Sequence, residues 1–385
     1  MKIPKIPANV WYLSFVSFFN DTASEMLYPV MPIFITQVLG APVFVVGLIE
    51  GVAEGSASIF KTIFGYWSDR LQRRKPFVIG GYLASAFAKI IIAASYVWPL
   101  VFLGRFVDRL GKGLRTGARD ALLLEATTEG DKGFIFGFHR SMDTLGAVLG
   151  PTIALALLWA FNNNIRLILI LAIVPAFLSL LFFFKVKEVK AKIQTTKIKL
   201  SLSIGSLSPN LKIFLAGLAV FSLGNSTDSF LILKAQSMGL SLALVISAYI
   251  LYNIVYAAAS TPAGEISDRI GKKKVFTVGI IIFALVYLGF AFNKNPILVF
   301  ALFAVYGFYI ALTDGVSKAL VGSMVQKEQA GTVYGVMTTT TSIFTLLASI
   351  IGGFLWSAIS PQATFIFAAV CAIASLFIFN FVRTK

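Results

Sequence analysis

The chain has 385 residues, of which 57% are hydrophobic and 13% are charged, and its formal net charge is +16. A soluble globular protein carries roughly 25% charged residues, so this composition excludes an ordinary soluble domain. Runs of about 20 apolar residues recur along the chain, the length that a helix needs to cross a bilayer. The single cysteine, Cys371, excludes a disulfide framework and a cysteine-based metal site.

The apolar runs are continuous rather than alternating, which predicts transmembrane helices and not a barrel. In chain order, the helices predicted in the first half are 9–36, 44–65, 76–97, 98–121, 134–160 and 166–186. Those predicted in the second half are 210–234, 240–262, 275–293, 296–318, 331–357 and 362–382. We therefore predict an all-α polytopic membrane protein of about twelve helices, arranged as two six-helix pseudo-symmetric bundles around a central cavity.

A long polar stretch rich in lysine separates the two halves. We interpret 187–209 as a basic linker between an N-terminal bundle at 1–186 and a C-terminal bundle at 210–385.

Lysine and arginine residues gather in alternate loops, above all at 70–75, 185–199 and 269–274, whereas the opposite loops have almost none. The positive-inside rule makes the basic side cytoplasmic, with both termini inside and the chain in the inner or plasma membrane of the cell. The net charge then reflects topology and attraction to anionic lipids, and we expect no nucleic-acid partner.

One short sequence occurs twice, as GYWSDRLQRRKPF at 65–77 and as GEISDRIGKKKVF at 264–276. Each copy lies in the basic turn between the second and third predicted helix of its half. The positive-inside rule explains the basic residues but not the shared Gly-x-x-Ser-Asp-Arg spacing. Two parallel six-helix repeats are an architecture of secondary transporters, in which the substrate binds at the midplane between repeats.

These motifs resemble the signature loop of the major facilitator superfamily, and the residues that carry the resemblance are Gly65, Asp69, Arg70 and Arg73, with Gly264, Asp268 and Arg269 as the second-half echo. GAVLGP, with Gly146, Gly150 and Pro151, is similar to the family's antiporter signature, although Thr152–Leu155 stands where a Gly-Gly often follows. The resemblance implies the transporter architecture and a gating role for the loop. It also implies that the glycine-lined helix at 44–65 packs across to the helix at 331–357.

The residues of the loop can form a polar latch. Asp69 lies where a helix leaves the membrane, and a carboxylate there can accept hydrogen bonds from the N-terminus of a neighbouring helix. Arg73 or Arg74 can pair with Asp120 or Glu125, near the end of the helix predicted at 98–121.

Charged residues within membrane-spanning helices are costly and are functional candidates by default. Asp21 with Glu25, and Glu50 with Glu54, are i,i+4 pairs, so each pair shares a helix face. We interpret these four acids as the proton-coupling candidates. Glu54 is favoured over Glu50 because it lies deeper, and Asp21 with Glu25 is the competing pair because their helix also crosses the centre of the membrane. A carboxylate that alternates between an apolar site and a basic partner takes up and releases a proton.

The helix predicted at 98–121 carries a basic stripe, with Arg105, Arg109, Lys112, Thr116 and Arg119 on roughly one face. Counting turns from the nearest helix end places Glu50 level with Arg105, and Glu54 level with Arg109 one turn deeper. The substrate-cavity candidates of this half are Asn20, Arg105, Arg109, Lys112 and Asp143. Two interpretations stand: these acid–base pairs hold the bundle together, or they serve coupling and substrate binding.

The second half has aromatic and polar side chains at helical spacing in otherwise apolar helices. Its substrate-cavity candidates are Asn225, Asp228, Tyr252, Asn253, Tyr256 and Tyr309. They suit the wall of a cavity for an organic molecule with an apolar body. Tyrosines near helix ends also suit the headgroup level of the bilayer.

We predict a secondary active transporter that works by alternating access and exports small amphipathic organic compounds in exchange for protons. The alternatives are transport or exchange of an organic anion, then of a metal or metal chelate, and then a non-transporting sensor or a lipid scramblase. The sequence has no catalytic triad and no nucleotide-binding motif, so we expect no enzyme activity, no cofactor and no bound metal. The expected partners are the substrate, protons and the lipid bilayer, with the chain acting as a monomer.

Overall fold

The computed structural model describes the chain except residues 1–5, 72, 127–131, 189–206, 326–329 and 384–385. The described residues form helices and no strands, and ten of their helical spans are long and apolar enough to cross a bilayer. The predicted all-α polytopic fold is confirmed. Most of the predicted linker at 187–209 lies outside the described residues.

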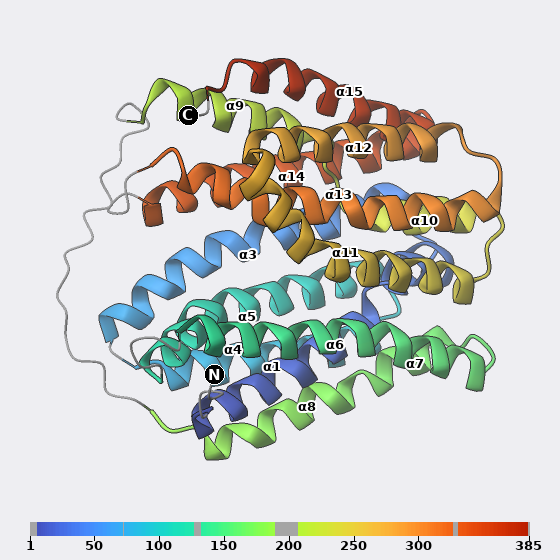
Figure 1. Ribbon diagram of the computed structural model, residues 1–385. Coiled ribbons are helices and arrows are strands. Elements are labelled where there is room, and N and C mark those ends of the chain that lie inside the picture. The colour runs from blue at the N-terminus through green and yellow to red at the C-terminus, as the bar shows by residue number, and fades with distance from the viewer. Residues whose placement is uncertain (1–5, 72, 127–131, 189–206, 326–329, 384–385) are drawn as a thin grey trace. The chain divides into compact units, whose positions relative to one another are not determined.

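The chain divides into two compact units, and the first consists of Met1–Ala41 and Val52–Gln194. The helices of the first half, blue to light green in Figure 1, are α1 (Ala8–Leu27), α2 (Met31–Ile33), the π-helix η1 (Phe34–Val38), α3 (Val43–Leu71), α4 (Lys75–Ala93), α5 (Trp98–Glu125), α6 (Lys132–Ala160), α7 (Ile165–Leu171), α8 (Ile173–Leu181) and the 3-10 helix η2 (Phe182–Lys185). The helix α5 is not among the ten apolar spans, because it carries many charged residues, of which Arg105, Asp108, Arg109 and Arg115 are buried.

The second unit consists of Pro42–Gly51, at the start of α3, and Thr195–Lys385. Its other helices are α9 (Pro209–Gly224), α10 (Ser229–Ser237), α11 (Leu242–Ile270), α12 (Lys272–Phe292), α13 (Pro296–Gly322), α14 (Ala330–Ala358) and α15 (Pro361–Asn380). Within this unit Gly47 packs so closely on α14 that an added Cβ would overlap the carbonyl oxygen of Ser349. This is the glycine-mediated packing that the family resemblance implied.

Three helices predicted as continuous are interrupted. The span predicted at 9–36 ends its first helix at Leu27, and Pro29 and Pro32, which lack an N–H donor, accompany the change to α2 and η1. The span predicted at 166–186 divides at Ala172 into α7 and α8.

The third interruption separates α9 from α10 at residues 225–228. The backbone N–H of Thr227 donates to the Ser349 hydroxyl at 3.1 Å, and the N–H of Ser229 donates to the Thr227 hydroxyl at 3.3 Å. Side-chain oxygens of this kind offer the backbone an alternative to helical hydrogen bonds. The prediction of one helix over 210–234 was therefore wrong at its centre.

Glycines set the closest helix contacts of the first unit. The helices α1 and α6 lie side by side (Figure 1), and a Cβ at Gly150 would lie 2.6 Å from the carbonyl oxygen of Thr22. A Cβ at Gly146 would lie 2.6 Å from the carbonyl oxygen of Phe18. Small residues at these positions let the two backbones approach, as in other membrane helix pairs.

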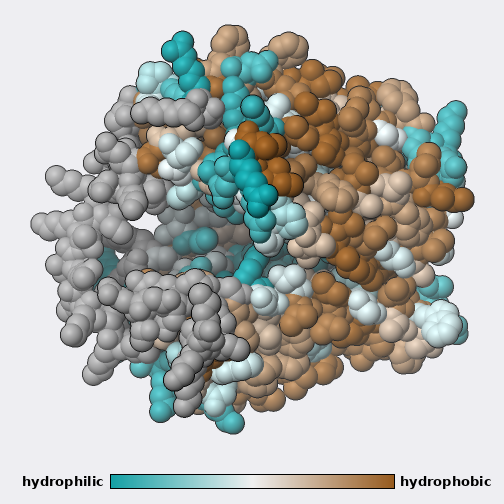
Figure 2. Space-filling view, viewed as in Figure 1, coloured by the Kyte–Doolittle hydropathy of each residue, from teal (hydrophilic) through white to brown (hydrophobic). Residues whose placement is uncertain are grey.

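Apolar side chains cover much of the visible surface in Figure 2. Trp159 is 90% exposed, Phe184 85% and Phe377 67%. Such exposure suits helix faces that lie against lipid rather than water.

Candidate functional site

The candidate site consists of the buried polar side chains in the membrane-spanning helices, and each unit has its own set. In the first unit, Glu54 of α3 forms an ion pair with Arg109 of α5, with 2.9 Å between Oε1 and Nη2. The Arg109 side chain is 9% exposed, whereas that of Glu54 is 46% exposed. Counting helix turns in the sequence placed Glu54 level with Arg109, and the structure shows this pair. Glu54 therefore combines a partly exposed carboxylate with a buried basic partner.

The close packing of α1 on α6 brings a second group of acids together. A Cβ at Gly146 would lie 3.2 Å from the Cβ of Asp21, and one at Gly150 would lie 2.7 Å from the Cβ of Glu25. Asp143 lies one turn before Gly146 on the same helix and is buried. Glycines of the GAVLGP motif thus hold Asp21 and Glu25 against the helix that carries Asp143.

The partners of Asp143 are a hydrogen-bonded cluster that sequence reasoning did not assemble. Asp143 Oδ2 lies 3.9 Å from Arg119 Nη1, and Asp143 Oδ1 lies 3.7 Å from His139 Nε2. The hydroxyl of Ser14 lies 3.1 Å from His139 Nδ1. Ser17 accepts a hydrogen bond from Arg119 at 3.1 Å.

Ser17 also lies 2.8 Å from the hydroxyl of Tyr82, so four helices contribute to this cluster. Ser14, Ser17 and Asp21 follow one another at i, i+3 and i+7, which is the spacing of one helix face. That polar stripe is the signal in the sequence from which the cluster could have been found.

Another buried ion pair joins α4 to α5. Lys89 Nζ lies 3.3 Å from Asp108 Oδ1, and the two side chains are only 2% and 9% exposed. Lys89 also donates to the carbonyl oxygen of Ser85. Because water reaches neither partner, this pair suits the interpretation of structural glue better than that of coupling.

The basic stripe of α5 divides into buried and exposed members. Arg105, Arg109 and Arg115 are buried. The guanidinium carbon of Arg115 lies over the ring of Tyr82, 4.5 Å from the ring centroid. Lys112 is exposed, and no described residue forms an ion pair with its side chain. Asn20 is buried and donates to Asp21 at 3.3 Å, and Glu50 is also buried.

The interruption between α9 and α10 positions the principal acid of the second unit. Asp228 accepts hydrogen bonds from the hydroxyl of Tyr306 at 2.6 Å and from that of Tyr252 at 3.3 Å. The rings of Tyr252 and Tyr306 are themselves in contact, with centroids 5.4 Å apart. Tyr309 packs against Tyr306 at 5.2 Å. Asp228 and three tyrosines from α11 and α13 therefore form one cluster.

The remaining second-half candidates lie apart from the Asp228 cluster or bond locally. The hydroxyl of Tyr256 donates to Asp314 at 3.1 Å, and Asp314 also pairs with Lys318 at 2.8 Å. Asn253 donates to the Tyr249 carbonyl one turn earlier in its own helix. Asn225 lies in the interruption before Asp228 and is half-buried.

The polar latch can be traced only in part. Arg74, one of the two candidate arginines, lies 3.6 Å from Glu125 and also donates to Ser68 at 3.1 Å. The side chain of Asp69 lies outside the described residues. Arg73 is exposed.

The loop residues of both copies sit in open surroundings. Arg70 and Arg269 are exposed, and a Cβ added at Gly65 or Gly264 would meet no atom of another element within 4 Å. Asp268 pairs with Lys272 at 2.8 Å. Among the described residues, no group of three or more His, Cys, Asp or Glu side chains is placed to hold a metal ion.

The family model of the Major Facilitator Superfamily matches residues 13–251 and 213–385. The chain belongs to the major facilitator superfamily. It is a multi-pass membrane transporter of small molecules and not an enzyme.

Relatives of this superfamily member span nearly the whole chain. An uncharacterized MFS-type transporter of Methanocaldococcus jannaschii is 37% identical over 96% of this chain and 94% of its own. Multidrug resistance protein MdtG of Salmonella arizonae is 23% identical over 94% of this chain and 91% of its own. The crystal structure of a mutant of the nucleoside transporter NupG superposes with a TM-score of 0.82 at 15% identity, covering 98% of this chain and all of that one, which shows a shared fold.

Proposed function

We propose that this transporter exports small amphipathic organic compounds in exchange for protons, by alternating access. It acts as a monomer in the cell membrane with both termini in the cytoplasm. In this proposal, the polar residues of the first unit and those of the second have separate tasks. The acids of the first unit handle the proton, and the tyrosine cluster around Asp228 contributes to the substrate site.

The observation that carries the proposal is the pair of Glu54 with Arg109. A carboxylate at 46% exposure can exchange a proton with water, and at 2.9 Å it makes a charge-assisted hydrogen bond to a buried arginine. Protonation of Glu54 removes its charge, and the buried arginine then loses this ionic partner. Breaking such a pair is strongly unfavourable unless the helices rearrange, so proton binding can drive a change of conformation.

The second-half cluster supports an organic substrate with an apolar body. Tyr252, Tyr306 and Tyr309 are buried, and their aromatic rings surround the polar groups of Asp228. Aromatic walls with a few fixed polar groups are typical of small-molecule sites. MdtG, named for multidrug resistance, is a relative of matching length.

Flux in proteoliposomes under an imposed pH gradient tests the proposal. A thermal-shift screen of amphipathic cations, neutral compounds and organic anions first selects a ligand that stabilises the purified protein. Export against its gradient, driven by protons moving the opposite way, is the expected result. Co-movement of substrate and proton, or flux that ignores the pH gradient, would contradict proton antiport.

Transport or exchange of an organic anion is the second candidate. The exposed side chain of Lys112, which forms no ion pair within 4 Å with a described residue, favours it, because a lysine can bind a carboxylate or phosphate of a substrate. Under this alternative, Lys112→Gln weakens anion-driven exchange. Under proton antiport of cationic or neutral compounds, the same substitution leaves the pH-driven flux intact.

A further inference from the structure

A hollow of about 700 Å³ lies on the surface of the first unit, between α4 and the segment formed by α8 and η2. This volume falls in the range of about 300–1,000 Å³ that is usual for ligand sites. The lining residues are Lys75, Ile79, Leu83, Val174, Phe177, Leu178, Leu180, Leu181, Phe183 and Phe184. We call this hollow the α4–α8 groove. Nine of its ten lining residues are apolar, and the tenth is a lysine.

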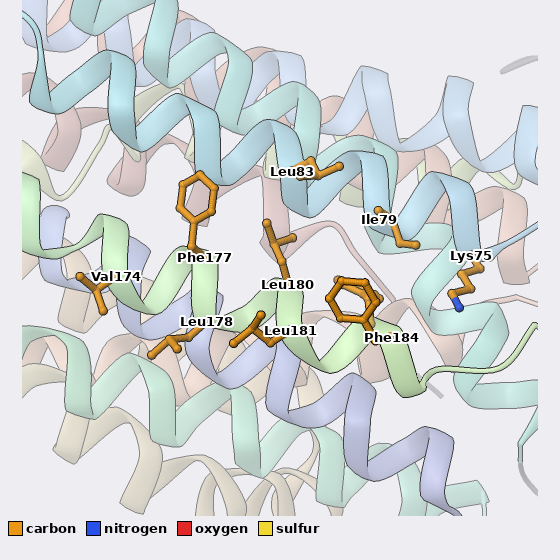
Figure 3. A pocket seen from close by; sticks show the side chains of 10 residues that line it. Lys75, Ile79, Leu83, Val174, Phe177, Leu178, Leu180, Leu181 and Phe184 are labelled. Atoms are coloured by element: carbon orange, nitrogen blue, oxygen red, sulfur yellow. The ribbon is translucent and has the colours of Figure 1, made fainter.

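The lysine sits at one end of the groove. Figure 3 shows Lys75 at one end and Val174 at the other, with the apolar side chains of both helices between them. From Val174 to Phe184 the chain advances by about 15 Å at the helical rise of 1.5 Å per residue. This is about half of a ~30 Å hydrocarbon core, which is the depth of one leaflet.

The charge of Lys75 is available for a ligand. Its side chain forms no ion pair with any described residue. The carboxylate of Glu188 accepts hydrogen bonds from the backbone N–H groups of Arg74 and Lys75, at 2.8 and 3.0 Å. Because Glu188 already occupies the N-terminus of α4, an anionic ligand would bind the lysine side chain instead.

We infer that the α4–α8 groove is a binding site for one anionic phospholipid, with an acyl chain along the apolar walls and the phosphate headgroup on Lys75. Several walls of the groove are open to the bilayer, since Val174 is 53% exposed and Leu181 58% exposed. Lipid tails already lie in hydrocarbon, so the hydrophobic effect alone cannot select one lipid from another. Selection comes from the charged end. The inference is independent of the proposed transport mechanism.

A second hollow supplies an internal comparison. It lies between α12 and α13, has a volume of about 450 Å³, and is lined by apolar residues with Asn293 but without a basic side chain. By the same argument it accepts lipid chains without preference for a headgroup. The α4–α8 groove should therefore differ from this hollow in one respect, which is its preference for lipids with a negatively charged headgroup.

Native mass spectrometry of the full-length protein tests the inference. Purified protein receives equal amounts of phosphatidylglycerol and phosphatidylcholine with identical acyl chains. Wild type should retain phosphatidylglycerol about five-fold more strongly, which corresponds to the ~1 kcal/mol that one lysine contributes at an anionic surface. Lys75→Ala should remove this preference. The matched control is Lys274→Ala, which removes an exposed lysine from the start of α12, and it should keep the preference.

A second pair of variants tests the apolar walls. Leu178→Trp fills the α4–α8 groove and should lower retention of both lipids, whereas Leu298→Trp fills the α12–α13 hollow and should leave the phosphatidylglycerol preference unchanged. Helical circular dichroism checks that each variant is folded. Equal retention of the two lipids by wild type, or equal effects of the two lysine variants, would overturn the inference. So would displacement of the lipid by inorganic phosphate alone, or a dimer of this chain that forms in place of lipid binding.

Discussion

Individual charged residues of the first unit differ most in how exposed their side chains are. The pair of Lys89 with Asp108 is enclosed, whereas Glu54 is nearly half exposed beside Arg109. An enclosed pair matters for stability mainly because breaking it is costly. Either partner left alone would be an unpaired buried charge. An accessible acid with a buried partner can change its charge during a transport cycle. Exposure therefore separates the two interpretations that charge spacing left open.

Replacing Asp108 should expose the structural role of its pair. Asp108→Asn leaves Lys89 buried without a countercharge and should lower the free energy of unfolding by about 3–5 kcal/mol. The matched control is Asp268→Asn, which breaks the pair with Lys272, where the Asp268 side chain is 70% exposed, and should change stability by less than about 1 kcal/mol.

Denaturant unfolding in detergent, followed by circular dichroism, measures both variants. The double variant Lys89→Met with Asp108→Leu should recover most of the loss, because it removes both charges together. Equal stability of Asp108→Asn and Asp268→Asn would show that the enclosed pair is not structural.

Whole helices were predictable from hydropathy, but their interruptions were not. Pro151 and Pro262 lie inside continuous helices α6 and α11, while Pro29 accompanies an interruption, so the residue type alone does not decide. The break before Asp228 depends on hydrogen bonds to hydroxyl groups, one of which is accepted by Ser349, more than 100 residues away. A single sequence does not contain that pairing.

The candidate site was likewise predictable only in part. The pair of Glu54 with Arg109 followed from depth counting, because both lie on regular helices of known rise. The partners of Asp143 did not follow, because the rotation of α1, α4 and α5 about their axes decides which side chains meet Asp143. Close packing at Gly146 and Gly150 fixes the placement of α1 against α6.

Substituting Gly150 should disturb this contact between elements. Gly150→Ala would place a Cβ 2.6 Å from the carbonyl oxygen of Thr22 and should destabilise the protein by about 1–3 kcal/mol through overpacking. Gly315→Ala in α13 is the control, because no atom lies within 4 Å of its added Cβ. It should be neutral or stabilising by up to about 1 kcal/mol, since alanine favours helices. Thermal unfolding in detergent would contradict the packing argument if both substitutions had the same effect.

At the scale of the whole molecule, the two halves repeat one plan but divide the polar residues unequally. Enclosed and exposed ion pairs crowd the first unit, whereas an acid among tyrosines marks the second. In the proposed antiport, the acids of the first unit handle the proton and the tyrosine cluster of the second contributes to the substrate site. By the positive-inside rule, the duplicated loop with its basic cluster predicts which side of the bilayer faces the cytoplasm.

The orientation can be tested with cysteines, since the natural Cys371 is buried. In a Cys371→Ser background, Lys187→Cys should resist a membrane-impermeant maleimide in intact cells and react after permeabilisation. Lys294→Cys, an equivalent change in an exposed loop predicted on the other side, should react in intact cells. The reverse pattern would invert the proposed topology.

Proton movement and substrate flux, recorded in the same vesicles for Glu54→Gln, test the central claim most directly. Glutamine imitates the protonated acid permanently, so this variant should still bind and exchange substrate but lose accumulation driven by a pH gradient. The matched control Glu265→Gln, at an exposed acid of α11, should behave like wild type. The amide variants of Glu50, Asp21 and Glu25 extend the series to the other acids of the first half. If all four variants retained gradient-driven flux, proton coupling through these acids would be wrong, and exchange of organic anions along the basic stripe would become the better account.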